Sequence, residues 1–144
     1  MTRIEFHFNT TDRLTYACRL LRKALGRNLR VGVIGAPATL RQLDVALWTF
    51  SAPDFLPHCT ASDASDIQAA SAIVLGDDPA IMGRLDVLLN LGDEVPQGFD
   101  GYERLIEIVA TDEHGRMTAR QRWKHYAALG YELHQHDLAK AVTA

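Results

Sequence analysis

Basic and aromatic side chains alternate along a segment near the C-terminal end of the chain, from Arg116 to Leu129. If the segment is helical, with 3.6 residues per turn, Arg116, Arg120 and Lys124 lie on one stripe. Trp123 follows Arg120 by three residues and therefore lies beside it. A guanidinium that can hold a carboxylate through two hydrogen bonds is thus next to a large apolar ring. The pattern suits a ligand with an acidic group and an apolar end, such as the C-terminus of a peptide.

Two other interpretations of this segment stay open. Ala119 and Tyr126 extend its apolar side, so the segment could instead be a solvated basic face with Trp123 in the core. Bases of single-stranded nucleic acid also stack on aromatic rings beside cations. The chain has 15 basic and 18 acidic side chains and a formal charge of −3, which argues against nucleic-acid binding driven by overall charge.

A second aromatic side chain, Trp48, is predicted to lie at the border of a helix's apolar face. Leu43 and Leu47 recur at helical spacing, and Trp48 falls about a quarter turn away from Leu47. A loop with Phe55 and Pro57 follows. Exposed aromatic residues beside a rigid proline loop are typical of an interface anchor. The alternative is that the loop folds back and covers Trp48.

Turns rich in glycine and acidic residues follow three predicted strands. The turn after Gly35 occupies the place of a dinucleotide-binding loop, but Pro37 removes a backbone donor, and neither GxGxxG nor a Walker motif is present. Gly76-Asp77-Asp78 and Gly92-Asp93-Glu94 could hold magnesium, although Asp and Gly also form ordinary turns. A small nucleotide-binding or metal-dependent enzyme using the turns after Gly35 and Gly76 is therefore the alternative to a binding protein.

Histidine and cysteine residues are scattered in this chain. His134 and His136 alternate near the C-terminus, but no cysteine lies nearby to complete a familiar zinc pattern. Cys18 lies on a predicted apolar stripe, and Cys59 has no partner in a CxxC pair, so both are expected to be reduced and structural. We predict no catalytic residue, no metal and no cofactor.

Short strands alternate with helices along the sequence, which predicts a three-layer α/β fold whose mostly parallel sheet is covered by helices on both faces. In the first strand, Ile4, Phe6 and Phe8 are predicted to face the core, and Glu5 and His7 to face solvent. Capping oxygens are expected at 9–12 for the first helix and at Thr39 for the second. The expected strands are 3–8, 30–35, 72–75, 85–91 and 105–109, and the expected helices end near 26, 50 and 130.

Length and composition fit a single domain over residues 1–144, with 47% hydrophobic residues. No run approaches the about 18 consecutive apolar residues that a membrane-spanning helix requires. The first residues alternate like a strand and do not resemble a secretory leader. These features indicate a cytoplasmic protein with no membrane association.

Three segments together resemble the chi subunit of bacterial DNA polymerase III. They are 43–48 (LDVALW), 55–58 (FLPH) and 120–126 (RQRWKHY) continuing to Gly130-Tyr131, and the resemblance covers essentially the whole chain. It implies an accessory clamp-loader subunit with a nucleotide-binding-like fold, no phosphate-binding motif and no catalytic site. Such a subunit links the psi subunit to the acidic C-terminal tail of single-stranded-DNA-binding protein.

The resemblance also implies roles for individual residues. Arg120 would hold the terminal carboxylate of the tail, with Val109, Trp123 and Lys124 around it, and Arg116 would meet the tail's acidic residues. Many members carry Tyr where this chain has Trp123. A second set, Trp48, Phe55 and Pro57, would face psi, and a helicase-like repair protein can also use that surface.

Overall fold

In the computed structural model, residues 2–49, 58–60, 72–76 and 86–141 are described. They contain a seven-stranded sheet with the order β3-β4-β2-β5-β6-β1-β7, in which every pairing is parallel. The strands are β1 Arg3–Phe8, β2 Val31–Ile34, β3 His58–Thr60, β4 Ile73–Gly76, β5 Val87–Asn90, β6 Arg104–Ile108 and β7 Leu133–Asp137. The predicted α/β class with a mostly parallel sheet is confirmed.

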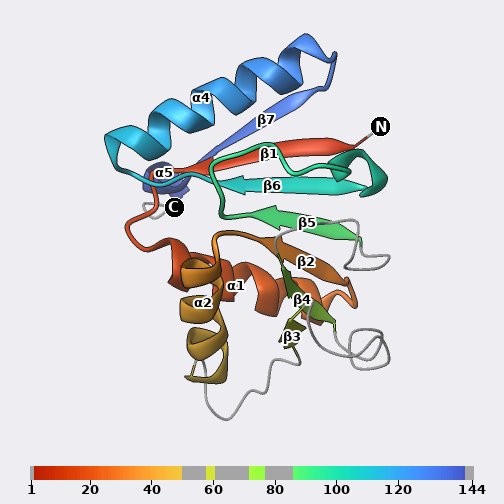
Figure 1. Ribbon diagram of the computed structural model, residues 1–144, viewed down its shortest axis with the longest axis vertical. Helices are drawn as coiled ribbons and strands as arrows, with labels where there is room; N and C mark the ends of the chain where they lie inside the picture. Colours follow the sequence, from red (N-terminus) through yellow and green to blue (C-terminus); the bar gives the residue numbers. More distant parts are fainter. Residues whose placement is uncertain (1, 50–57, 61–71, 77–85, 142–144) are drawn as a thin grey trace.

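Helices cover both faces of this sheet (Figure 1). They are α1 Arg13–Gly26, α2 Pro37–Thr49, α4 Glu113–Ala128 and the short α5 Leu138–Ala141, with a 3-10 turn η2 at Phe99–Gly101. One buried cluster joins α1 and α2 to residues such as Val33, Leu89 and Ile106. A second joins α4 to Ile4, Leu88 and others on the opposite face. Two cores thus give the three expected layers.

The α4 helix lies over the end of the sheet formed by β1 and β7 (Figure 1). Asp112 caps it, because its side chain accepts a hydrogen bond from the backbone of Gly115. Gly130, with a φ of 87°, follows its C-terminal end. The helix begins three residues before the predicted start at Arg116, since the polar residues 113–115 form its first turn rather than a loop.

Three further details differ from the sequence-based expectations. Glu5 and His7 are buried, not solvated, because β1 is an interior strand and α1 lies over that face. Thr39 does not cap α2, which already begins at Pro37, a residue whose fixed φ and missing N–H suit the first helical position. The strands β3 and β7 were not predicted, since β3 has only three residues and β7 contains mostly polar ones.

None of the helices within the described residues is both long and apolar enough to cross a membrane.

Gly115 tests the contact between the start of α4 and the loop before it. A Cβ atom at this position would lie 2.6 Å from both Ala110 Cβ and Asp112 Oδ1. We expect Gly115→Ala to lower the free energy of unfolding by about 1–3 kcal/mol, because such overpacking forces the backbone to shift. Gly26→Ala is the matched control, since no atom lies within 4 Å of its Cβ position. In urea denaturation the control should be as stable as the wild type or more so, and equal stability of Gly115→Ala would contradict the clash.

Candidate functional site

A hollow of about 480 Å³ lies between α4 and the β1–β7 end of the sheet. Its walls contain all five residues that the sequence analysis proposed for binding a peptide tail: Val109, Arg116, Arg120, Trp123 and Lys124. Four of them come from α4, and Val109 directly follows β6. The tertiary structure adds Phe6 and Phe8 from β1 and Gln135 from β7, among other residues that sequence reasoning did not include.

The floor of the hollow is apolar and continuous with the core. Trp123 is half-buried, and its ring meets Phe6 edge to face, with 5.1 Å between ring centroids and 64° between the planes. The Phe6 ring also meets the Tyr126 ring edge to face, with 6.0 Å between centroids. Val109 is buried beside them. Trp123 therefore fits both the peptide-binding and the core interpretation of the sequence, because it packs on the core and also lines the hollow.

The rim of the hollow is cationic. Arg116, Arg120 and Lys124 are exposed, and their side chains make no ion pair or hydrogen bond within the part of the chain that the structure describes. Their charges are thus available to an external anion, whereas an arginine already paired with a carboxylate would have to exchange that partner. A cationic rim over an aromatic floor matches a ligand with one acidic and one apolar end.

A buried polar cluster beneath α4 holds this helix in place. Glu107 of β6 accepts hydrogen bonds from Arg122 Nε at 3.1 Å and from the Tyr126 hydroxyl at 2.6 Å. Asn90 of β5 donates to both Glu107 oxygens, at 3.0 and 3.1 Å. Arg122 also donates to the carbonyl of Asp93 at 2.8 Å. Two residues of α4 are therefore tied to two neighbouring strands.

Burial is the main cause of the pKa shifts of Glu107 and Tyr126 in this cluster. Burial raises the pKa of Glu107, and the charge of Arg122 opposes that shift. Burial and the nearby Glu107 raise the pKa of Tyr126, so its hydroxyl stays protonated and donates. Sequence reasoning placed Tyr126 on the apolar side but missed Arg122. The signal was present, since Ala119, Arg122 and Tyr126 share one helical face at spacings of three and four.

The second predicted surface is only partly within the described residues. Trp48 is 60% exposed at the end of α2, and Val45 nearby is 63% exposed. The Trp48 ring is tilted against His58, with 4.9 Å between centroids, and His58 Nε2 lies 2.8 Å from Asp44 Oδ1. Phe55 and Pro57 lie outside the described residues. Trp48 is therefore an exposed side chain fixed beside the start of β3.

Of the turns considered for nucleotide or magnesium binding, those after Gly35 and Gly92 lie within the described residues, and neither forms an assembled site there. Gly35 and Gly92 approach each other at the ends of β2 and β5, where an open hollow is lined partly by Asp93 and Glu94. These two carboxylates would repel a phosphate, and Arg13, which also lines the hollow, already donates to the carbonyls of Leu91 and Ile108. The turn after Gly76 lies outside the described residues. The turn after Gly35 therefore gives no support to the alternative of a small enzyme that uses this turn.

Arg120 and Arg122 are expected to contribute very differently to the free energy of unfolding, although only one residue separates them in the sequence. Replacing buried Arg122 by Met should lower the free energy of unfolding by about 3–5 kcal/mol, because Glu107 loses its only described cationic partner. Replacing exposed Arg120 by Met should change it by no more than about 0.5 kcal/mol. Chemical denaturation of both variants measures this difference. Equal destabilisation would contradict the assignment of Arg122 to the core and Arg120 to the surface.

Comparison with known proteins gives consistent matches. Residues 1–134 match the model of the family described as DNA polymerase III chi subunit, HolC. A protein of Pseudomonas aeruginosa named DNA polymerase III subunit chi is 33% identical over 145 aligned positions, covering 97% of this chain and 99% of that protein. A protein of the same name from Haemophilus influenzae is 28% identical over 93 positions, covering 64% of this chain and 63% of that protein.

Proposed function

This chain belongs to the chi-subunit family of DNA polymerase III, accessory subunits in DNA replication, and we propose that it is an adaptor with two binding surfaces. One surface, the hollow beneath α4, binds the acidic C-terminal tail of single-stranded-DNA-binding protein. The other, around Trp48, binds the psi subunit and so connects the chain to the clamp loader. The adaptor acts in the cytoplasm and without catalysis of its own.

The observation that carries the tail proposal is the position of Arg120 and Trp123 on the same hollow. A free C-terminus ends in a carboxylate, and the guanidinium of Arg120 can hold both of its oxygens. The last side chain of the peptide would then enter the apolar floor formed by Trp123 and Phe6. The volume of about 480 Å³ is within the usual range for sites that enclose a small ligand or a chain terminus.

Arg116 and Lys124 extend this recognition along α4. Each lies one turn from Arg120 on the exposed stripe, at a spacing of four residues. Acidic residues that precede the terminal carboxylate would meet these cations. Because exposed charges are screened by salt, this part of the interaction should govern the salt dependence.

A fluorescent peptide with an acidic segment and an apolar C-terminal residue tests the tail site. We expect Arg120→Ala to weaken binding at least tenfold, because hydrogen bonds to a charged group contribute about 1.5–3 kcal/mol. Arg19→Ala removes the same charge from an exposed site on α1 and is the matched control. The same peptide with an amidated C-terminus should bind the wild type as weakly as the acid binds Arg120→Ala. Undiminished binding by Arg120→Ala would overturn the site assignment.

The surface around Trp48 is the second part of the proposal. Large exposed aromatic residues are frequent energetic anchors of interfaces, and Trp48 is both exposed and held by the His58 ring. Phe55 and Pro57 belong to the same proposed surface through the family resemblance alone. A helicase-like repair protein could compete with psi for this surface, because both would use Trp48.

Trp48→Ala separates the two surfaces experimentally. The variant should lose at least tenfold in affinity for purified psi, since a buried interface tryptophan contributes about 2 kcal/mol or more. It should bind the tail peptide like the wild type, because Trp48 is not part of the hollow. Isothermal titration calorimetry with psi and with the tail peptide measures both affinities. Unchanged psi binding would remove Trp48 from the interface, and loss of both affinities would contradict two independent surfaces.

A further inference from the structure

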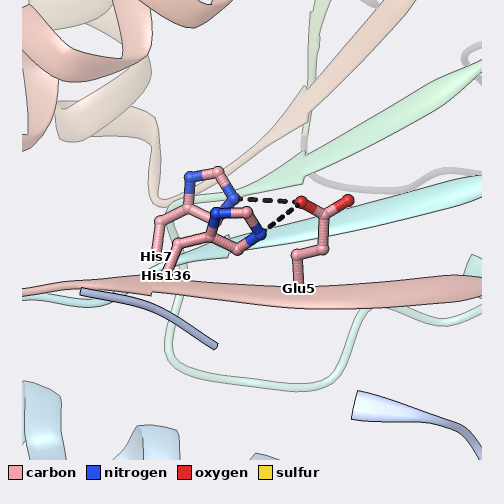
Figure 2. Close-up of side chains that lie close together, drawn as sticks. All are labelled: Glu5, His7 and His136. Atoms are coloured by element: carbon pink, nitrogen blue, oxygen red, sulfur yellow. Dashed lines mark hydrogen bonds and ion pairs between the residues drawn. The ribbon is translucent and has the colours of Figure 1, made fainter. Parts of the chain in front are cut away.

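Three potential metal ligands converge on the face of the sheet that α1 covers (Figure 2). They are Glu5 and His7 of β1 and His136 of β7. Glu5 Oε1 lies 3.3 Å from His7 Nε2 and 3.1 Å from His136 Nε2. The ligand atoms of all three lie within 4.8 Å of one another, and no other such group of three is found in the described part of the chain.

These separations fit a small tetrahedral ion. Zinc binds imidazole nitrogen and carboxylate oxygen at about 2.0–2.2 Å, so two ligand atoms of a tetrahedral site are about 3.3–3.4 Å apart. Both nitrogen–oxygen distances are already near that value. Two imidazoles and one carboxylate are also a ligand set that zinc uses when its fourth position is left open.

Neighbouring residues hold the ligands in these orientations. The other ring nitrogen of His7, Nδ1, is hydrogen-bonded to the Tyr16 hydroxyl. The guanidinium of Arg104 donates to both oxygens of Glu5 and fixes the plane of the carboxylate. Such outer partners are typical of metal sites, because they set the tautomer and direction of each ligand. The pairing of His7 with His136 across β1 and β7 fixes the remaining ligand.

The carboxylate of the cluster attracts a cation, whereas two neighbouring arginines weaken that attraction. Glu5 Oε1 faces both imidazoles, and Arg104 donates to both oxygens of this carboxylate. Zinc binding requires both imidazoles in their neutral form. Arg104 and, at 3.4 Å, Arg3 also contact Glu5 and reduce its charge toward the metal.

We propose that Glu5, His7 and His136 bind one Zn²⁺ ion, with a fourth position open to solvent on the side of His136. The His136 side chain is 44% exposed, which gives an ion an entry path to the buried Glu5 and His7. The site joins the edge strand β7 to the interior strand β1. It lies on the opposite face of these strands from the hollow, which Phe6 and Gln135 line. It is therefore independent of the proposed tail binding and departs from the sequence-based expectation of no metal.

Zinc titration of untagged, chelator-treated full-length protein tests this site. We expect one Zn²⁺ per chain by competition with a chromophoric chelator, together with a higher Tm, because the ion binds the folded state. Mg²⁺ should have neither effect, since it prefers oxygen ligands. NMR signals of the ring nitrogens of both His7 and His136 should shift with zinc.

Two variants of β7 provide the comparison. His136→Ala should bind zinc at least tenfold more weakly and lose the rise in Tm. His134→Ala removes an imidazole two residues away that lies beside Glu132 and outside the cluster, and it should behave like the wild type. His136→Asn keeps a polar side chain at the same position and should lose zinc binding without loss of stability in the metal-free state. Equal zinc binding by wild type and His136→Ala, or an unshifted His7 signal, would overturn the proposal.

Discussion

A single buried carboxylate, that of Glu107, connects the helix that forms the candidate site to the sheet. A carboxylate with no access to water is costly unless its oxygens are fully hydrogen-bonded. In this chain both oxygens are satisfied, by Arg122 and Tyr126 from α4 and by Asn90 from β5. Apolar packing alone tolerates sliding of a helix on a sheet, whereas these directional bonds define one position of α4 along its axis and one rotation about it.

The rotation of α4 decides which of its cations are free. Arg122 points into the core, so the stripe containing Arg120 must point away from it, since two residues correspond to about 200° on a helix. The same rotation brings Trp123 over Phe6 and forms the floor of the hollow. The polar cluster and the candidate binding site are thus two consequences of one orientation, although no residue of the cluster lines the hollow.

Strand β1 serves two surfaces because its side chains alternate. Phe6 and Phe8 face α4 and line the hollow, while Glu5 and His7 face α1 and form the polar group with His136. The partner strand β7 alternates in register with it, since Phe6 pairs with Gln135 and His7 with His136. The polar edge strand β7 thus contacts Glu5 through His136 on one face and borders the hollow through Gln135 on the other.

Much of the fold was determined by local sequence. The alternation in 3–8, the apolar runs and the 3.6-residue spacing located β1, β2, β4, β5, β6 and the helices α1, α2 and α4, but not the short α5. The positions of Arg116, Arg120, Trp123 and Lys124 on one helical side followed from spacing alone. The strand β7 and the burial of Glu5, His7 and Arg122 were decided by tertiary structure. Polar residues have no intrinsic preference for the interior, and they become buried only where distant residues supply hydrogen bonds and opposite charges. For the same reason, the sequence could indicate the basic aromatic helix, but only the packing of α4 over β1 and β7 created a hollow beneath it.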